Sequence, residues 1–436
     1  MKKRKLLLLL LSLLLIGQLA CQKNNSTVKP LKIGALLTTS GPYAGFGIPY
    51  AVFYRAYIDY IKAHPDKYPY LKGQELQAVF YDDGGDSALG TVLLNKLLSE
   101  DEVAAIVGVF GNWNIIANQK LLEESLVPVV CFALASSAPA YQELGFGYKN
   151  VVTWQPLWES EGAILYLRAV TAFGDKINKI SVIYTNNEES QSLLKGLKTQ
   201  AEQDVRSKKA ELVYINIDPE DNTEEIKSRL TDLPNNQLII IAAGQNLLTK
   251  VYPLIQENPL SQGLPILTTY ANMSVNVIPK EAYKEKASPL YGGAWWVYAA
   301  NNNEKTENSH NLLDYQDFCA IIDWTDSINI QDKETFKTDN NAISAYIAIS
   351  TFLVGLERLK EENLEYNLEN YLLVMQEKQL AIAISGNANS NLNSKNNQMA
   401  LALFAFEPGE ERNQKSATFK MIEDFSTAAE LFAKLK

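Results

Sequence analysis

Short apolar runs alternate with helical patterns along most of the chain, and this order limits the fold more than any other feature. The runs 31–37, 104–110 and 127–132 are almost continuously apolar. The segments 48–64 and 88–101 carry apolar residues at three- and four-residue spacings, which is typical of amphipathic helices. Helices between successive strands join them as parallel βαβ units, and strands apolar on both faces belong to a covered sheet. The sequence therefore predicts an α/β fold.

A second series with the same order begins after Thr153. A helical pattern over 161–174 precedes two strand-like runs, 179–186 and 210–217, which are separated by another helical pattern. Strand and helix patterns continue to alternate beyond them. Two similar series in tandem predict two similar lobes, inferred from the order of elements because no repeat of the residues themselves is visible.

The later part of the chain differs from the two series in amino-acid composition. The stretches 294–311 and 385–398 are rich in asparagine, and a long helical pattern at 341–363 lies between them. Asparagine-rich stretches of this length favour solvated loops.

Composition supports a folded protein and argues against a nucleic-acid partner. Of the 436 residues, 47% are hydrophobic and 21% are charged, a balance that allows a sizeable core. The formal net charge is −10 at pH 7, whereas proteins that bind nucleic acid need a basic face to neutralise phosphates.

Residues 1–20 have the pattern of a signal peptide and are set apart from the fold. Four basic residues at 2–5 precede an apolar run at 6–16. This run is shorter than the ~20 residues that a membrane-spanning helix needs, so it predicts cleavage and export more than a permanent anchor.

The end of this segment, Gly17-Gln-Leu-Ala-Cys21, resembles the lipobox of bacterial lipoproteins, with Gln18 where an aliphatic residue is usual. The resemblance implies that Cys21 is lipidated and becomes the mature N-terminus, with 21–30 as a polar tether. The expected location is the cell envelope, outside the cytoplasm, on the periplasmic side or the cell surface. Ordinary secretion with a residual Cys21 is the alternative.

The sequence offers little for catalysis, for a metal or for a cofactor. His64 and His310 are the two histidines, and their contexts lack metal-ligand spacing. Cys131 and Cys319 lie in apolar contexts typical of packing, and a disulfide between them stays open. The G-x-S-x-G pattern of serine hydrolases is absent. We therefore expect no enzyme, no cofactor and no bound metal.

The stretch "YDDGGDS" at 81–87 is similar in composition to a calcium-binding loop, but it does not complete the EF-hand pattern. Its acids Asp82, Asp83 and Asp86 are instead predicted to cap the following helix and to hold the strand end.

The loop 38–47, "TTSGPYAGFG", connects the first strand to the first helix. It lacks both the G-x-G-x-x-G order and the G-x-x-x-x-G-K-[ST] order that cradle nucleotide phosphates. It presents instead an aromatic residue, Phe46, between two glycines.

Four stretches in order carry a resemblance to a known family: "LKIGALLTTSGPYAGFG", "LQAVFYDDGGDS", "VAAIVGVFGNWN" and "SLVPVVCFALASSAP". Together they resemble the first lobe of the branched-chain amino-acid (Leu/Ile/Val) type of periplasmic binding protein, the type I solute receptors of ABC importers. The resemblance implies two doubly wound parallel-sheet lobes, joined by three hinge crossings near Gln155, Trp295 and Ser385. The implied segments are lobe 1 at 31–155, lobe 2 at 156–294, a return to lobe 1 at 295–385 and a return to lobe 2 at 386–436.

The resemblance also implies a ligand site beyond the carboxyl ends of the strands, between the lobes. Phe46 falls at the position of an aromatic lid, and Asn112 at a position that contacts a ligand carboxylate and can cap its helix. Ser136, or its neighbour Ser137 if the gap is placed differently, falls where relatives bind the ligand through a hydroxyl. The expected ligand-binding residues are Phe46, Asn112, Trp113, Ser136, Ser137, Trp158 and Tyr270, with Trp154 as a further aromatic candidate.

Two positions depart from the amino-acid-binding pattern. Trp158 and Tyr270 stand where such relatives place acids that hold the ligand's ammonium group, although Glu159 or Glu161 could substitute through a small shift. Removing one partner of a buried charge pair costs about 2–5 kcal/mol, so a site without these acids should not favour a standard free amino acid. The expected ligand is uncharged or bears a carboxylate, with an apolar or planar body that stacks on aromatic rings.

The resulting hypothesis is a substrate-binding lipoprotein of an ABC importer that captures a small molecule by hinge closure. Its expected partners are the ligand, the permease and the membrane through the N-terminal lipid, and the chain is expected to be a monomer. The alternative is a lipoprotein on the same scaffold that senses a ligand or binds another protein without transport.

Overall fold

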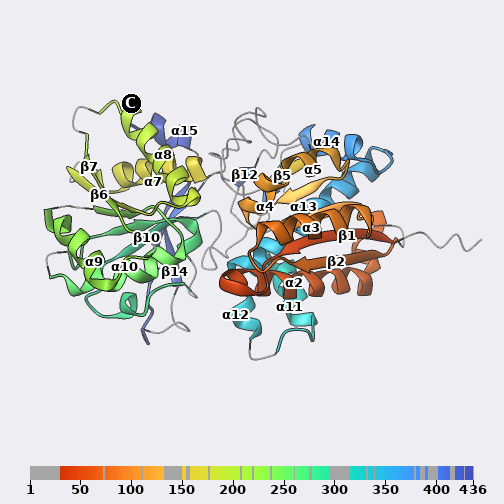
Figure 1. The fold of residues 1–436 in the computed structure, drawn as a ribbon, viewed down its shortest axis with the longest axis horizontal. Helices are drawn as coiled ribbons and strands as arrows, with labels where there is room; N and C mark the ends of the chain where they lie inside the picture. Colours follow the sequence, from red (N-terminus) through yellow and green to blue (C-terminus); the bar gives the residue numbers. More distant parts are fainter. Residues whose placement is uncertain are drawn as a thin grey trace, which may run out of the picture.

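The structure, a computed structural model, contains two bodies that lie side by side along the long axis of the molecule (Figure 1). The residues that it describes are 30–71, 74–109, 111–131, 150–153, 158–174, 177–206, 209–218, 220–235, 238–259, 261–273, 277–294, 315–329, 332–337, 339–377, 380–382, 388–390, 401–412, 418–426 and 428–435.

The first body, lobe 1, is built on a five-stranded sheet in the order β2-β1-β3-β4-β5, and every neighbouring pair is parallel. Its strands are β1 (Leu31–Leu37), β2 (Leu76–Asp82), β3 (Ala105–Val109), β4 (Val129–Cys131) and β5 (Val151–Thr153). All five residues of β3 are buried, as expected for a central strand covered on both faces.

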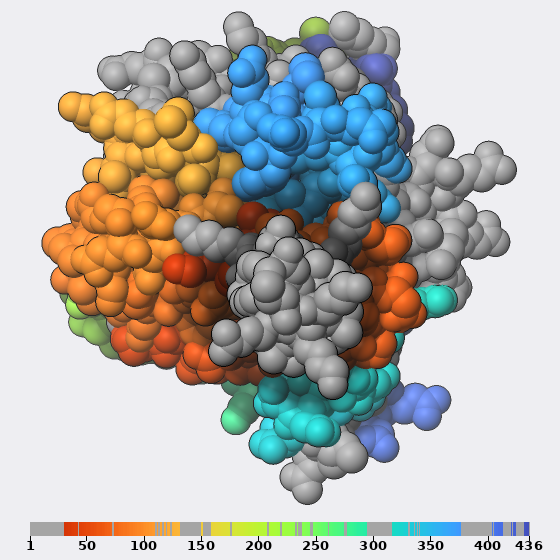
Figure 2. All heavy atoms as spheres, turned by 90° about the vertical axis from the view of Figure 1, so that its right-hand side faces the viewer, coloured from red at the N-terminus to blue at the C-terminus, as the bar shows by residue number. Residues whose placement is uncertain are grey.

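The helices of lobe 1 come from two distant parts of the chain. The first set is α2 (Ala44–Ala63), α3 (Ser87–Ser99), α4 (Asn112–Ala117) and α5 (Gln119–Glu124), and the second set is α11 (Tyr315–Trp324), α12 (Lys333–Lys337), α13 (Asn340–Glu361) and α14 (Leu368–Glu377). The Tyr57 hydroxyl of α2 lies 3.1 Å from the Ser350 hydroxyl of α13. Figure 2 shows the later helices, in blue, beside the orange residues of the first set.

Helix α13 is the core helix of lobe 1. Its stretch Asn341–Glu361 is long and apolar enough to cross a membrane by length and composition, but 89% of that apolar window is buried inside the protein. Its apolar character is therefore explained by packing against α2 and the first sheet.

The second body, lobe 2, is built on a seven-stranded sheet in the order β14-β13-β10-β9-β8-β6-β7. Its strands are β6 (Lys179–Tyr184), β7 (Glu211–Asn216), β8 (Leu238–Ile241), β9 (Ile266–Thr268), β10 (Leu290–Ala294), β13 (Leu401–Glu407) and β14 (Thr418–Ser426). The pairs from β7 to β10 are parallel, whereas β13 is antiparallel to both β10 and β14. The predicted two-lobed α/β fold is confirmed, with an antiparallel edge that the sequence pattern did not predict.

The helices of lobe 2 are α7 (Trp158–Ala172), α8 (Glu188–Gln203), α9 (Thr223–Arg229), α10 (Gln245–Glu257) and α15 (Ala428–Ala433). Glycines bring α7 and α8 into backbone contact. A Cβ added at Gly196 would lie 1.8 Å from the Glu159 carbonyl oxygen, and one at Gly162 would lie 1.9 Å from that of Leu193. No larger residue fits at either position without moving the helices apart.

Short elements complete the described structure. They are η1 (Gly41–Tyr43), η2 (Pro65–Lys67), η3 (Pro69–Leu71), η5 (Leu230–Asn235), η6 (Tyr270–Asn272) and η7 (Lys280–Tyr283), with a separate hairpin of β11 (Leu380–Ile382) and β12 (Ala388–Ser390).

Three sequence-based boundaries were wrong. Helix α2 begins at Ala44, four residues before the helical pattern predicted at 48–64, and Pro49 lies inside it. The helix that Asn112 was expected to cap is two short helices, α4 and α5, separated at Asn118. Residues 388–390 form strand β12 within a predicted asparagine-rich loop, since pairing with β11 satisfies their backbone. The expected hinge crossings near Gln155, Trp295 and Ser385 lie outside the described residues.

Candidate functional site

At the carboxyl ends of the lobe 1 strands, two acids join the loop after β1 to the loop after β2. The Asp82 carboxylate accepts hydrogen bonds from the backbone N–H of Thr39 at 2.8 Å and of Ser40 at 3.2 Å. Burial alone would raise the pKa of Asp82, but hydrogen bonds from the Ser40 side chain and from the backbone N–H groups of Gly84 and Thr39 hold it below its usual range. The Asp83 carboxylate accepts from the Thr38 hydroxyl at 2.6 Å.

The third acid of this stretch, Asp86, is the N-cap of α3. Its carboxylate accepts from the N–H groups of Ala88 at 2.7 Å and Leu89 at 3.2 Å. The prediction that these acids cap a helix and hold a strand end is confirmed. In the part of the chain that the structure describes, no group of three or more histidine, cysteine, aspartate or glutamate residues could hold a metal ion.

These contacts support the start of α2, where Phe46 lies. A Cβ at Gly47 would lie 1.9 Å from the Thr38 carbonyl oxygen, so only glycine lets α2 begin this close to the end of β1. Phe46 therefore stands in the first turn of a helix and not in a loop, and its side chain is half-buried. Its backbone position is at the carboxyl edge of the lobe 1 sheet.

Other expected residues of lobe 1 are placed only in part. Asn112 and Trp113 are the first two residues of α4. The structure describes their backbone but not their side chains. The expected capping role of Asn112 is wrong, because Gly111, with φ 81°, is the N-cap and Asn112 is the first helical residue. Ser136, Ser137, Trp154 and Cys21 lie outside the described residues.

An asparagine that the sequence did not single out contributes to the lobe 1 edge. The buried Asn114 side chain of α4 donates to the Asp83 carboxylate at 2.5 Å and so connects the third strand–helix unit to the first two. The sequence could not indicate this role, because Asn114 and its partner Asp83 are 31 residues apart and no local pattern connects them.

In lobe 2, Trp158 and Tyr270 lie at the carboxyl edge of the sheet. Trp158 is the first residue of α7, and Tyr270 is the first residue of η6, directly after β9 and Thr269. Both side chains are half-buried, and each packs against core residues on one side. The two positions are brought together by a hydrogen bond between their elements.

That hydrogen bond comes from Glu161, one turn after Trp158. Its carboxyl is 1% exposed and accepts from the backbone N–H of Tyr270 at 2.7 Å. Burial, with a smaller contribution from the charge of Glu189, raises the pKa of Glu161 to about 8, although the Tyr270 hydrogen bond acts in the opposite direction. Glu161 is therefore mostly protonated at neutral pH.

Glu159 and Glu189 complete the acids near this edge. Glu159 forms an ion pair with Lys195 of α8 at 2.6 Å, so its charge is already compensated. Glu189, in the first turn of α8, lies against Gly244 at the N-cap of α10, where an added Cβ would be 3.1 Å from the carboxylate. Burial also raises the pKa of Glu189.

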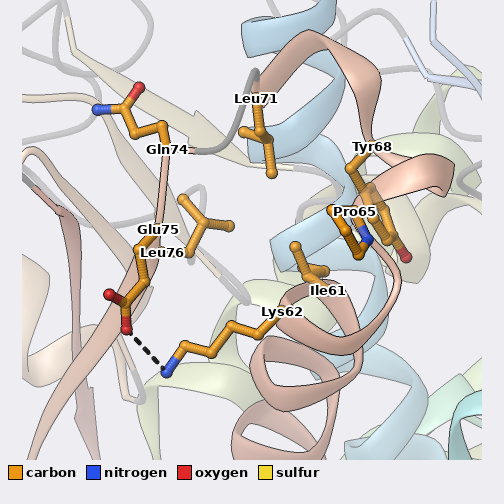
Figure 3. Close-up of a pocket in the computed structure, with 8 residues that line it drawn as sticks. All are labelled: Ile61, Lys62, Pro65, Tyr68, Leu71, Gln74, Glu75 and Leu76. Atoms are coloured by element: carbon orange, nitrogen blue, oxygen red, sulfur yellow. Dashed lines mark ion pairs between the residues drawn. The ribbon is translucent and has the colours of Figure 1, made fainter. Parts of the chain in front are cut away.

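A pocket of about 320 Å³ lies elsewhere, at the end of α2 and the start of β2. Ile61, Pro65, Tyr68, Leu71 and Leu76 make it largely apolar, and an ion pair of 3.5 Å between Lys62 and Glu75 lies at its edge (Figure 3). It is at the amino end of β2, opposite the edge that carries Phe46, and it is not the predicted ligand site.

Two facing α/β lobes, each with loops and helix starts at the carboxyl ends of its strands, define a two-lobed binding protein of the type I periplasmic fold. The sequence model described as "Periplasmic binding protein" matches residues 30–309. The chain belongs to this family. Because the family binds solutes, the expectation that the chain is not an enzyme is confirmed.

Solved structures show the same fold at low sequence identity. A solute-binding protein of an ABC transporter from R. palustris in complex with 4-hydroxybenzoate superposes with a TM-score of 0.68 at 14% identity, covering 92% of this chain and 98% of that one. A fatty acid ABC transporter substrate-binding protein from Thermomonospora curvata has a TM-score of 0.67 at 16% identity, covering 93% and 94%.

A branched-chain amino acid transporter protein of Streptococcus pneumoniae in complex with isoleucine has a TM-score of 0.64 at 12% identity, covering 91% and 100%. The comparison with curated proteins finds no match.

Proposed function

We propose that this chain is the extracytoplasmic substrate-binding lipoprotein of an ABC importer. It captures a small organic ligand between its lobes, and ligand contacts to both lobes stabilise the closed arrangement that a permease recognises. The proposed ligand bears a carboxylate on an apolar or planar body and is not a standard free amino acid.

The single observation that carries the ligand class is the state of the acids beside Trp158 and Tyr270. Glu159 is paired with Lys195, and Glu161 is buried, bonded to the Tyr270 N–H and mostly protonated. Neither acid offers the unpaired carboxylate that an ammonium group needs. The half-buried rings of Phe46, Trp158 and Tyr270 supply stacking surface instead.

The relatives agree with this choice in chemistry. The R. palustris protein is in complex with 4-hydroxybenzoate and another from the same organism with benzoate, and the Thermomonospora curvata protein is described as a fatty acid ABC transporter substrate-binding protein. These molecules are carboxylates with apolar bodies. The Streptococcus pneumoniae protein is in complex with an amino acid and represents the competing class.

Isothermal titration of the purified mature protein with benzoate, 4-hydroxybenzoate, octanoate and isoleucine tests the proposal. We expect binding of at least one of the three simple carboxylates and none of isoleucine. Binding of isoleucine alone would overturn the ligand class. Failure of all four, together with no small molecule released on denaturation and detected by mass spectrometry, would favour the alternative of a sensing or protein-binding lipoprotein.

Phe46→Ala should weaken binding of the preferred carboxylate by about 1–2 kcal/mol, roughly tenfold in Kd, because one stacking ring and its buried area are lost. The melting temperature should stay unchanged. Val92→Ala, at an exposed position of α3 in the same lobe, is the matched control and should bind normally. Equal affinity in well-folded Phe46→Ala would remove Phe46 from the site.

Trp158→Asp should shift preference toward isoleucine, because it adds an ionised carboxylate at the half-buried start of α7, where the helix dipole keeps it charged. Trp158→Ala is the control for loss of the ring alone. If the aspartate variant folds and gains no isoleucine binding over the alanine variant, the alignment of Trp158 with the acid of amino-acid-binding relatives is wrong.

The lipid anchor is part of the proposal and rests on the sequence "GQLAC" at 17–21. Mass spectrometry of the mature N-terminus should find a diacylglycerol on Cys21. Cys21→Ser should release the protein from membranes. An unmodified Cys21 in the wild type would contradict lipidation and support the alternative of ordinary secretion.

A further inference from the structure

The structure joins the two aromatic elements of lobe 2 through a single buried carboxyl. Glu161 extends from the first turn of α7, which Trp158 opens, to the backbone N–H of Tyr270, which opens η6. The two residues are 109 positions apart in the chain, and the bond is 2.7 Å long. Its position between two expected ligand contacts distinguishes it from an ordinary core hydrogen bond.

Glu161 lies where α7 and α8 pack closely against each other. At the next residue, Gly162, the backbone of α8 approaches so closely that a Cβ would lie 1.9 Å from the Leu193 carbonyl oxygen. Glu161 itself is 1% exposed.

The rest of η6 is held independently of Glu161. The Asn272 amide donates to the Ala243 carbonyl at 2.8 Å and to the Thr268 hydroxyl at 2.7 Å, which ties the far end of η6 to the ends of β8 and β9. The Tyr270 N–H, at the near end, is bonded by Glu161. Loss of the Glu161 acceptor should therefore loosen Tyr270 without releasing the whole loop.

We propose that Glu161 is a positioning residue of the ligand site, which sets Tyr270 relative to Trp158 by accepting the hydrogen bond of the Tyr270 N–H. The inference rests on the proposed function, because it assigns the two rings to the ligand. Glu161 itself does not contact the ligand in this scheme.

The charged groups around Glu161 determine how it responds to pH. From α8, Glu189 faces it and disfavours its ionisation, Glu188 is exposed, and Lys195 is engaged by Glu159. Neither η6 nor β9 contributes a charged residue. Raising the pH through about 8 therefore ionises Glu161 beside Glu189. The two carboxylates then repel each other, while the hydrogen bond from the Tyr270 N–H strengthens because it favours the charged form of Glu161.

The test uses protein labelled with ¹⁵N-tyrosine, with the Tyr270 signal assigned by its absence in Tyr270→Phe. In the wild type we expect the Tyr270 amide shift to titrate with a midpoint near pH 8. In Glu161→Gln, which keeps the carbonyl acceptor but cannot ionise, the titration should vanish while the amide stays protected from hydrogen exchange. In Glu161→Leu, which has no acceptor, exchange of this amide should accelerate about tenfold or more.

Affinity for the carboxylate that the wild type binds should follow the same order. At pH 7, Glu161→Gln should match the wild type, and Glu161→Leu should bind about tenfold more weakly. Glu159→Gln, in the same turn of α7 but paired with Lys195, is the matched control and should change neither the exchange nor the affinity. If Glu161→Leu does not fold, the titrations of the Tyr270 amide shift in the wild type and in Glu161→Gln still test the inference.

The outcomes separate this inference from the proposed function. A Tyr270 amide that does not titrate between pH 6 and 10, or that exchanges equally in Glu161→Leu and wild type, would overturn the inference even if carboxylates bind. Intact affinity in Glu161→Leu would overturn it as well. If the Tyr270 signal behaves as expected but none of the tested carboxylates binds, the contact stands and the ligand class is wrong.

Discussion

The contact between α7 and α8 at Gly196 makes a quantitative prediction for the substitution Gly196→Ala. The added Cβ would lie 1.8 Å from the Glu159 carbonyl oxygen, and the clash is with backbone that cannot rotate away. Contacts of Cβ atoms below 3.0 Å are essentially never seen, so the two helices must separate by more than an ångström. Overpacking of this kind costs about 1–3 kcal/mol or more.

The intrinsic preference of helices for alanine opposes this cost. Replacing glycine by alanine inside a helix is worth about 1 kcal/mol in the absence of contacts. We therefore expect Gly196→Ala to lower the free energy of unfolding by about 2 kcal/mol net, combining overpacking with helix preference. Because the first turn of α7 also carries Trp158 and Glu161, binding of the preferred carboxylate should weaken as well.

Urea unfolding followed by fluorescence, with calorimetry as a second measure, gives the change in stability. Gly45→Ala in the first turn of α2 is the matched control, since nothing lies within 4 Å of its added Cβ. It should be neutral or stabilise the protein by up to about 1 kcal/mol. If Gly196→Ala were as stable as Gly45→Ala, the close crossing of α7 and α8, and the reasoning built on it, would be refuted.

Two further predictions concern the acids. Asp86→Ala should cost about 1 kcal/mol of stability because the α3 cap is lost, and Ser87→Ala beside it should cost less; equal losses would contradict the cap. Glu161→Gln should flatten the dependence of stability on pH. The folded protein holds a proton on Glu161 up to about pH 8, whereas the ordinary pKa is 4.5, so its stabilising effect is complete below 4.5 and lost as pH rises through 8. Between pH 6 and 8 the wild type should lose about 2 kcal/mol relative to Glu161→Gln, and parallel curves from chemical denaturation would show that Glu161 is ionised throughout.

Much of the fold could be predicted because its signals are local. The run 31–37 coincides with β1, and the helical patterns at 88–101 and 341–363 coincide with α3 and α13 within two residues. Each pattern repeats over neighbouring residues, which share one face of one element. Asp86 was predicted as a cap for the same reason, because its partners are two and three residues away.

The candidate site was predictable only in outline. Phe46, Trp158 and Tyr270 were placed by resemblance, and the structure puts their backbones at the carboxyl edges of the two sheets. The sequence left open which of Glu159 and Glu161 could hold an ammonium group. The fold shows that Glu159 pairs with Lys195 and that Glu161 is buried and bonded to the Tyr270 N–H, contacts that depend on elements that meet in space.

The sequence by itself determined that this chain alternates strands and helices in two series. The tertiary structure alone decided the antiparallel edge of the second sheet, the glycine contact of α7 with α8, and the burial of Glu161 against the Tyr270 N–H. The physical reason is distance along the chain: periodicity and capping act between neighbours, whereas desolvation and charge repulsion depend on every group that folding brings close.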